Sequence, residues 1–303
     1  MLTEQEKIRY KRHFLLEGWD EEKQEKMKNT TVFVAGAGGT GSPTITMLAL
    51  MGVGCIRICD FDIFEESNKN RQFIHCLADE RLGMNKAKSA ALTVHSLNPN
   101  VRVEYVEEKI EASNVDQIVG DAQMIFDCLD RFRYKFVLAD CAMRKNIPLF
   151  FYGIMDYNNF AYLFYPPKTA CFHCLFDEKK IRLLDQMGSR KADVAAMSPA
   201  LFSAAGIMMT EAAKLLVGFD EPDYNSFLLS FGKRHDVSEQ RGVRAFGFWN
   251  TSYFRESCRR QGFDWKNCEE SPRFLSLSIP ADPNCPHCRA LQEAAASKRA
   301  NTL

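Results

Sequence analysis

Four cysteines in two closely spaced pairs are a strong chemical signal in this sequence. The pairs are Cys171-Phe-His-Cys174 and Cys285-Pro-His-Cys288, and each presents two sulfurs from one short segment. Four thiolates suit a closed tetrahedral Zn²⁺ site that leaves no position open to a substrate. We therefore expect a structural zinc ion that ties the second pair to the loop after the sixth strand. The histidine inside each pair is interpreted as a bystander.

A glycine-rich segment between an expected strand and an expected helix is the second signal. Gly36-Ala-Gly38-Gly39-Thr-Gly41 follows a β-prone run and precedes Ser42-Pro43, which can begin a helix. Glycines allow the backbone to approach phosphates, and a helix N-terminus supplies N–H groups and a positive dipole. We expect a nucleotide-phosphate loop. A tight turn without a ligand and an NAD-binding loop remain open at this point.

Carboxylates and cations follow the next strands in an informative order. Asp60 and Asp62 come at the end of the second strand, where they can accept hydrogen bonds from a ribose. Arg71 and Lys86 can neutralise phosphates, and Asp130, after the fourth strand, can hold Mg²⁺. Each of these residues alone is most simply a solvated surface residue. Their joint order favours a triphosphate over the second half of a dinucleotide.

Regular alternation of strands and helices would bring these side chains to one edge of a sheet. Residues 4–28 are charged with helical spacing and predict an N-terminal helical arm. Alternation from residue 31 to 152 predicts an α/β, Rossmann-like doubly wound sheet that is mostly parallel, with helices on both faces. The expected strands are 31–35, 55–60, 101–106, 124–128 and 149–152, and the expected helices are 42–51, 86–97, 115–119 and 132–145.

The pattern changes from residue 153 onward. Residues 153–166 predict antiparallel strands that extend the sheet, 200–217 a buried helix, and 227–231 and 274–279 two further strands. The polar and aromatic stretch 232–273 is interpreted as an insertion, either a small satellite core or a lid or partner-binding surface. The expected divisions are 1–30 for the helical arm, 31–152 for the nucleotide-binding half, and 153–303 for the antiparallel extension with the zinc site and the 232–273 insertion.

Composition excludes several classes of protein. The 303 residues are 46% hydrophobic, and 39 Lys and Arg balance 39 Asp and Glu, so there is no overall basic field for nucleic acid or an anionic membrane. The first residues are polar and lack a signal peptide's apolar core. Leu201–Val217 is interrupted by Glu211 and Lys214, which predicts a core helix too short to span a bilayer. We expect a cytoplasmic protein.

The order of motifs resembles the E1-like (ubiquitin-activating) superfamily, and within it the MoeB/ThiF/HesA-type adenylyltransferases. The resemblance covers most of the chain. The residues that carry it are Arg9-Tyr10-Lys11-Arg12, the loop at 36–41, Asp62, Ser67-Asn68-x-x-Arg71-Gln72, Lys86, Asp127-Cys-Leu-Asp130 and both cysteine pairs.

This resemblance implies an ATP-dependent adenylyltransferase that joins AMP to a carboxylate and releases pyrophosphate. Asp62 would bind the ribose, Asp130 the magnesium, and Arg12 would reach into the neighbouring protomer's site, which makes a homodimer the expected unit. The implied catalytic residues are Arg12, Arg71, Lys86 and Asp130. The expected nucleotide-binding residues are Gly36, Gly38, Gly39, Gly41, Asp60, Asp62, Asn68, Arg71, Gln72 and Lys86.

The resemblance also implies a substrate, the C-terminal glycine of a small ubiquitin-like sulfur carrier. A peptide or small-molecule carboxylate in a biosynthetic pathway is the alternative, and an NAD-dependent oxidoreductase or an inactive zinc-stabilised scaffold is less favoured. Many relatives carry a nucleophilic cysteine in the loop that here spans 175–200, where this chain has none and Lys191 takes the aligned position. An enzyme thioester on that loop is therefore not expected, although Cys258 or Cys268 could supply one.

Overall fold

A computed structural model describes most of the chain and positions the expected motifs. The described residues are 1–16, 18–76, 81–155, 158–165, 169–176, 196–218, 242–248, 274–280, 282–290 and 293, with only the backbone given for 153–155, 158–160, 242–248 and 274–280. The strand expected at 227–231, Lys191, Cys258 and Cys268 lie outside these residues.

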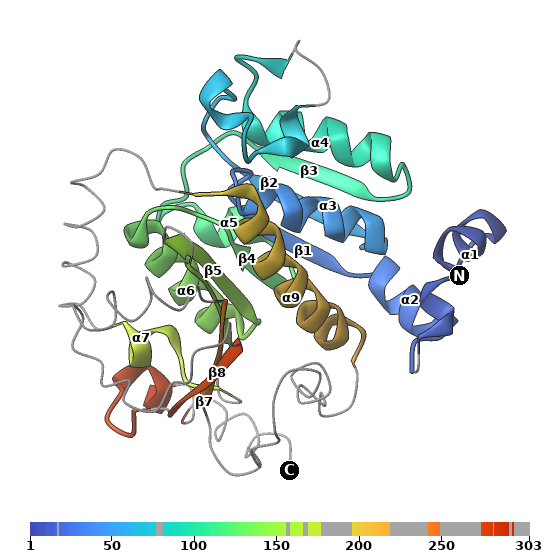
Figure 1. Cartoon of the computed structure of the whole chain (residues 1–303). Coiled ribbons are helices and arrows are strands. Elements are labelled where there is room, and N and C mark those ends of the chain that lie inside the picture. Colours follow the sequence, from blue (N-terminus) through green and yellow to red (C-terminus); the bar gives the residue numbers. More distant parts are fainter. Residues whose placement is uncertain are drawn as a thin grey trace.

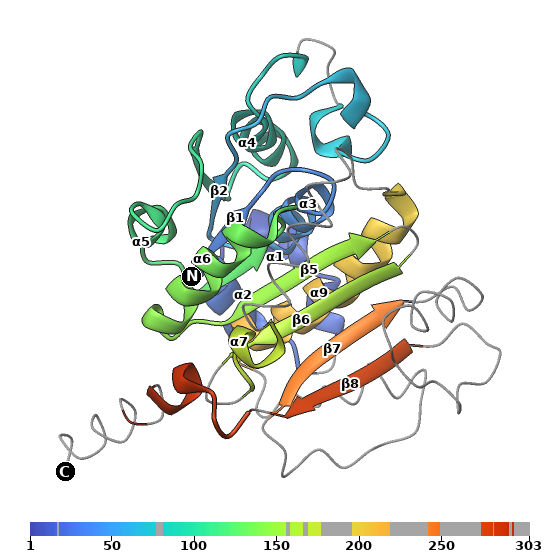
Figure 2. The same cartoon turned by 90° about the vertical axis from the view of Figure 1, so that its left-hand side faces the viewer.

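One eight-stranded sheet, in the order β3-β2-β1-β4-β5-β6-β7-β8, forms the centre of the fold. Its first five strands are parallel and the remainder of the sheet is antiparallel, which confirms the predicted fold class (Figures 1 and 2). The parallel strands are β1 (Thr31–Ala35), β2 (Cys55–Cys59), β3 (Arg102–Val106), β4 (Met124–Asp127) and β5 (Leu149–Met155). The antiparallel strands are β6 (Asn158–Phe164), β7 (Gly242–Phe248) and β8 (Phe274–Pro280).

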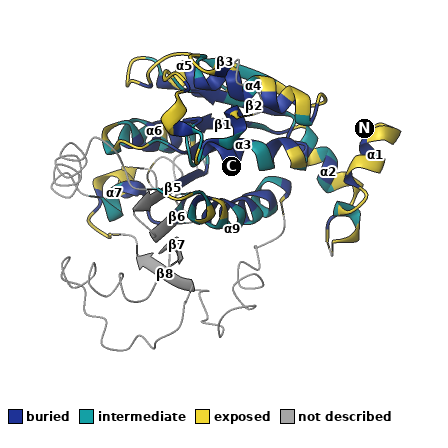
Figure 3. Cartoon of the chain, turned by 45° about the horizontal axis from the view of Figure 1, so that its top comes forward, coloured by how far each residue is buried: buried dark blue, intermediate teal, exposed yellow. Residues whose placement is uncertain are grey.

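Helices cover both faces of the sheet. The helices on one face are α3 (Gly41–Met51), α4 (Lys86–Leu97) and α9 (Ser198–Val217), and those on the other are α5 (Val115–Val119), α6 (Phe132–Lys145) and α7 (Phe172–Leu175). Side chains alternate along β1, so that Val32 and Val34 pack in the first apolar cluster and Phe33 and Ala35 in the second. The central strands are therefore buried on both sides (Figure 3).

Strand β7 lies inside the stretch 232–273 that the sequence left without a strand. It pairs antiparallel with both β6 and β8, so this part of the stretch belongs to the main sheet. Two of its seven residues, Gly242 and Gly247, are glycines, which weaken a strand signal. The rest of the stretch lies outside the described residues.

Helix α9 is the buried helix that the sequence predicted. It begins at Ser198 and has 20 residues, so by length and composition it could cross a membrane, contrary to the expectation that the segment is too short. Half of its most apolar 18-residue stretch is buried within the protein, however, and Ala205, Met208 and Ala212 pack in the first apolar cluster. A core helix can be as long and as apolar as a membrane-spanning one. The burial of α9 indicates that it is a core helix.

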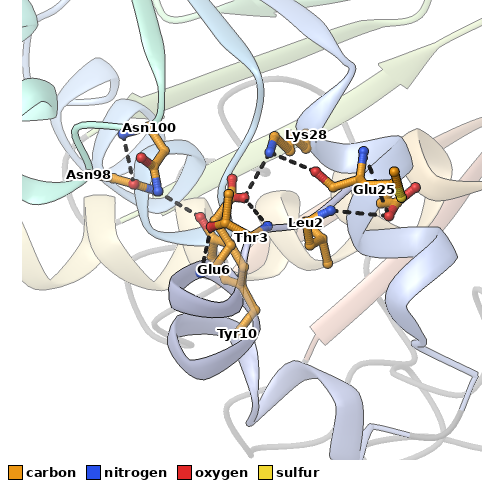
Figure 4. A network of polar contacts seen from close by, with 9 residues as sticks. Leu2, Thr3, Glu6, Tyr10, Glu25, Lys28, Asn98 and Asn100 are labelled. Atoms are coloured by element: carbon orange, nitrogen blue, oxygen red, sulfur yellow. Dashed lines mark hydrogen bonds and ion pairs between the residues drawn. The ribbon is translucent and has the colours of Figure 1, made fainter.

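The N-terminal arm consists of two helices, α1 (Glu4–Tyr10) and α2 (Glu21–Lys28), with a 3₁₀ turn, η1 (His13–Leu15), between them. The arm bends near Gly18, whose φ is +77°. Glu6 is buried, and its carboxylate accepts from the Thr3 N–H at 2.7 Å and pairs with Lys28 at 2.8 Å (Figure 4). The first contact caps α1, and the second holds α1 against α2.

Candidate active site

The carboxyl ends of β1 and β4 form the point where the strand order reverses. From β1 the chain proceeds to β2 and β3 on one side, whereas β4 and β5 lie on the other. Ligands of doubly wound sheets bind in the crevice outside such a point. The glycine loop at 36–41 follows β1, and the turn at 127–130 follows β4, so two predicted site segments meet here.

The glycine loop is compact because its backbone folds onto itself and onto β4. A Cβ on Gly41 would lie 2.0 Å from the Gly36 carbonyl oxygen, and one on Gly36, where φ is +92°, would lie 2.8 Å from the Cys128 carbonyl oxygen. Both positions therefore require glycine. The Thr40 hydroxyl also donates to the Cys128 carbonyl, at 2.9 Å. The loop leads directly into the N-terminus of α3, as a phosphate loop requires.

Asp60 holds the glycine loop from the end of β2. Its Oδ2 accepts the Ala37 N–H at 2.7 Å, and its Oδ1 accepts the Asp62 N–H at 2.9 Å. Burial raises the pKa of Asp60 to about 6, against the opposing effect of these two hydrogen bonds. Both oxygens of the carboxylate thus bind backbone groups of the predicted site.

Asp62 and Lys86 lie together, as the sequence order suggested. Lys86 is the first residue of α4, and its buried side chain places Nζ 3.3 Å from Oδ2 of the exposed Asp62. The Lys86 N–H also donates to the Asp62 carbonyl at 2.8 Å, and the Asn85 side chain donates to the Asp60 carbonyl at 2.9 Å. The end of β2 and the start of α4 are therefore joined, which places one cation beside one exposed carboxylate.

Two 3₁₀ turns, η2 (Glu66–Asn68) and η3 (Phe73–His75), bring Arg71 and Gln72 to the loop. A Cβ on Gly39 would lie 3.5 Å from the Arg71 side chain, and one on Gly38 would lie 3.7 Å from Gln72 Nε2. Asn68 is buried, and its Oδ1 accepts the Glu65 N–H at 3.2 Å. Among the described residues, Gln72 Oε1 is buried without a hydrogen-bond partner.

The turn after β4 separates its two carboxylates. Asp127 is fully buried, and its Oδ1 accepts from Lys135 Nζ at 3.0 Å and from the Leu129 N–H at 3.1 Å. Burial raises the pKa of Asp127, against the opposing Lys135 charge. Asp130 is exposed at the end of the same turn. Asp127 and Lys135 thus shape the turn, and Asp130 is exposed two residues after Cys128, whose carbonyl contacts the glycine loop.

Arg12 lies far from the glycine loop of its own chain. The Tyr10 hydroxyl accepts from Asn98, which follows the C-terminus of α4, at 2.8 Å (Figure 4). Lys86 begins the same 12-residue helix, so about 18 Å separate its two ends. Arg12 is exposed and two residues beyond Tyr10, a distance of at most about 7 Å along the chain. The structure therefore does not bring Arg12 together with the other predicted site residues.

His75 is a residue of this site that the sequence analysis did not single out. It is fully buried, and its two ring nitrogens lie 2.8 Å from the Ala37 carbonyl oxygen and 3.0 Å from the Ser89 hydroxyl. Burial lowers its pKa to about 4. A hydrogen bond to a backbone carbonyl requires no particular residue type in the partner, so the sequence holds no motif for this contact. Only the position of His75, three residues after Gln72, could have indicated a role in the site.

The four predicted zinc ligands meet at one point. Their sulfurs all lie within 4.8 Å of one another, with separations of 3.7 Å for Cys171–Cys174, 3.6 Å for Cys171–Cys285 and 3.5 Å for Cys174–Cys288. A zinc tetrahedron with bonds of about 2.3 Å has edges of about 3.8 Å, so the four sulfurs fit this ion. The Asp282 N–H donates to Cys174 Sγ at 3.4 Å, a contact that stabilises a thiolate.

The two histidines of the cysteine pairs form a second group nearby. His173 lies 2.7 Å from Asp140 of α6 and stacks on His287, with ring centroids 3.8 Å apart and planes at 10°. A metal bound in the plane of one ring cannot also lie in the plane of a parallel ring. The parallel stacking of the two imidazoles therefore does not suit a metal ion held by both. The contact between His173 and Asp140 instead joins the cysteine segments to α6.

The chain is similar to known proteins in sequence. The ThiF family profile matches residues 10–244. The chain is 29% identical to "Sulfur carrier protein ThiS adenylyltransferase" of Bacillus subtilis over 93% of this chain and 89% of that protein. It is 38% identical to "SAMP-activating enzyme E1" of Haloferax volcanii, over 56% of this chain and 62% of that protein.

Solved structures show the same fold. Escherichia coli MccB with ATP matches with a TM-score of 0.70 and 21% identity, covering 93% of this chain and 74% of that chain. MccB in a complex with MccA matches with a TM-score of 0.71 and 21% identity, covering 92% of this chain and 74% of that chain. At this identity the likeness concerns the fold alone.

Proposed function

Because the chain belongs to the ThiF family of E1-like adenylyltransferases, we propose that it activates the C-terminal carboxylate of a ubiquitin-like sulfur carrier. A carboxylate oxygen attacks the α-phosphorus of ATP, the bond from that phosphorus to the β-phosphate bridge breaks, and pyrophosphate leaves with the bonding electrons. The product is an acyl-adenylate. This reaction depends on alignment and on neutralising phosphate charge more than on proton transfer.

The observation that carries the proposal is the gathering of two cations and a carboxylate near the glycine loop. Arg71 lies beside Gly39, and Lys86 pairs with Asp62. The Asp62 N–H is bound by the same Asp60 carboxylate that binds the loop. In the proposed site the loop and the N-terminus of α3 hold phosphate oxygens, Arg71 and Lys86 neutralise the phosphates, and Asn68 and Gln72 bind there too. Because both Asp60 oxygens already bind backbone N–H groups, the ribose contact is assigned to Asp62. Two cations beside the loop favour a triphosphate over the nicotinamide alternative.

Asp130 is the proposed magnesium ligand. An exposed carboxylate at the crevice suits Mg²⁺, which proteins commonly bind through one or two carboxylates together with substrate phosphates. When bound, the ion would neutralise phosphate charge during the transfer. Asp127 and Lys135 would serve only to hold the turn that presents Asp130.

Arg12 is proposed to act in a homodimer. Its place at the far end of α4 keeps it from its own glycine loop, which agrees with a role in the site of a second protomer. Leu15 and Leu16 beside it are 74% and 57% exposed, as expected for residues that a partner would cover.

The zinc site is proposed to be structural. Four sulfurs complete the coordination of the ion, so no position is left for a substrate. The ion would tie Cys285 and Cys288 to α7, which contains Cys174 and is preceded directly by Cys171.

The sulfur carrier is preferred as substrate because the Bacillus relative named for that activity aligns over nearly the whole of both chains. A peptide or small-molecule carboxylate in a biosynthetic pathway is the second candidate. The absence of a cysteine from 175–200 favours it, since the adenylate would then pass directly to an external nucleophile. The similar MccB fold likewise belongs to a "Microcin C7 biosynthetic enzyme".

ATP–pyrophosphate exchange tests both candidates with one readout. Purified protein is assayed with ubiquitin-fold carriers and, separately, with peptides that end in a free carboxylate. Exchange that depends on a carrier supports the first candidate, and exchange that depends on peptides supports the second. Arg71→Ala should abolish it, whereas Arg144→Ala, which removes an exposed arginine at the far end of α6, should leave it unchanged. Arg71→Ala with wild-type exchange would contradict the assigned site.

A further inference from the structure

The peptide units on both sides of Ala37, in the middle of the glycine loop, are held by side chains from two other segments. Asp60 accepts the Ala37 N–H at 2.7 Å, and His75 lies 2.8 Å from the Ala37 carbonyl oxygen. Ala37 itself is fully buried. The loop is therefore fixed by two long-range hydrogen bonds as well as by its glycines.

The partners of His75 determine which of its nitrogens carries the proton. A carbonyl oxygen can only accept, so Nε2 donates to Ala37, and Nδ1 then accepts from the Ser89 hydroxyl at 3.0 Å. Both polar atoms of this buried ring are satisfied in the neutral form. The ring is thus a fixed bridge between the loop and α4.

This bridge determines where the next N–H of the loop points. The Ala37 carbonyl belongs to the same peptide unit as the Gly38 N–H, and in a planar trans peptide these two groups point in opposite directions. His75 holds the carbonyl toward the buried interior, so the Gly38 N–H is directed away from it. Within the described part of the chain, no hydrogen bond joins this N–H to a protein acceptor. An outward N–H on a phosphate loop is a donor to an anionic oxygen.

The same bridge sets the position of a cation. Ser89 lies three residues after Lys86 on α4, so the two side chains share one face of the helix. His75 also ends the segment that carries Arg71 and Gln72. One ring thereby joins the loop, the helix with Lys86 and the segment with Arg71.

We propose that His75 is a positioning residue for nucleotide binding, which orients the Gly38 N–H toward a phosphate of ATP and holds the loop in register with Lys86. The inference rests on the proposed ATP site and adds a residue to it. His75 does not touch the nucleotide, and acts through Ala37 and Ser89.

The test compares ATP binding and unfolding in three variants. His75→Leu removes both hydrogen bonds, and His75→Gln retains an amide donor and an acceptor. Thr93→Val is the matched control, because the Thr93 hydroxyl donates to the Ile74 carbonyl of the same 3₁₀ turn at 2.6 Å but makes no contact with the loop. ATP affinity is measured by titration calorimetry without an acyl substrate, and stability by thermal unfolding.

We expect His75→Leu to weaken ATP binding by about tenfold or more, a loss typical of an unpartnered buried acceptor. His75→Gln should recover most of the affinity, and Thr93→Val should bind ATP as the wild type does even where its Tm falls. Wild-type affinity in His75→Leu, or an equal loss in Thr93→Val at equal Tm, would overturn the inference. If His75→Leu does not fold, Ser89→Ala decides, because it removes the hydroxyl that holds Nδ1 of His75. Wild-type ATP affinity in Ser89→Ala would then overturn the inference. Wild-type protein that binds no ATP would contradict the proposed function together with the inference, so the two failures are distinguishable.

Discussion

Lowering the pH from 7.5 to 5 should destabilise the protein through His75. Burial lowers the pKa of this imidazole to about 4 from 6.5; the Ala37 contact opposes that shift, and the Lys86 and Arg81 charges add to it. Below pH 6.5 the imidazole of His75 is protonated in the unfolded chain, whereas in the folded protein it stays neutral down to about pH 4. The free energy of unfolding therefore keeps the whole contribution of neutral His75 above pH 6.5 and loses it as the pH drops toward 4. At pH 5 the loss is about 2 kcal/mol.

Urea unfolding of the wild type and of His75→Gln at both pH values measures this loss. The variant has no imidazole at this position, so acidification should cost it about 2 kcal/mol less than it costs the wild type. Asp60, whose pKa burial raises to about 6, has the opposite effect, because its contribution is lost as the pH rises. It is common to both proteins and cancels in the comparison. Equal losses in the two proteins would refute the argument.

Three further predictions concern the site and the metal. Asp130→Ala should abolish pyrophosphate exchange while the Tm stays within a few degrees of the wild type, because Asp130 is exposed; near wild-type exchange would remove it from the site. Mixing Arg12→Ala with Asp130→Ala protein should restore up to about one complete site per heterodimer, whereas no recovery after verified subunit exchange would count against a shared site. Metal analysis should find about one zinc per chain, and Cys174→Ala should lower both zinc content and Tm; a stable, metal-free wild type would contradict a structural ion.

The parallel half of the fold was predictable because its strands are short apolar runs separated by helix-length segments. The run Thr31–Ala35 was predicted with its observed ends, and so were α4 and α5. Strand β7 was missed because Gly242 and Gly247 are typical of a loop, and because its partners in β6 lie more than eighty positions away along the chain. Pairing over such a distance leaves no local signal.

The side chains with their own chemistry were the predictable part of the site. The glycine loop, Arg71 and Lys86 stand out because their residue types and order match phosphate binding. His75 was missed because its main partner is a backbone carbonyl, 38 residues away. Lys135 was missed because its partner, Asp127, is buried by the fold, and the sequence alone does not distinguish a buried carboxylate from an exposed one.

Isotope transfer tests the central claim, attack of a carboxylate on the α-phosphorus of ATP, most directly. The substrate that supports exchange is labelled with ¹⁸O in its C-terminal carboxylate, the adenylate is cleaved by an external nucleophile at its carbonyl carbon, and the nucleotide product is examined by mass spectrometry. Our account predicts AMP that carries one ¹⁸O, because the bridging oxygen comes from the carboxylate and leaves with phosphorus. Unlabelled AMP, or ADP as the product, would contradict it.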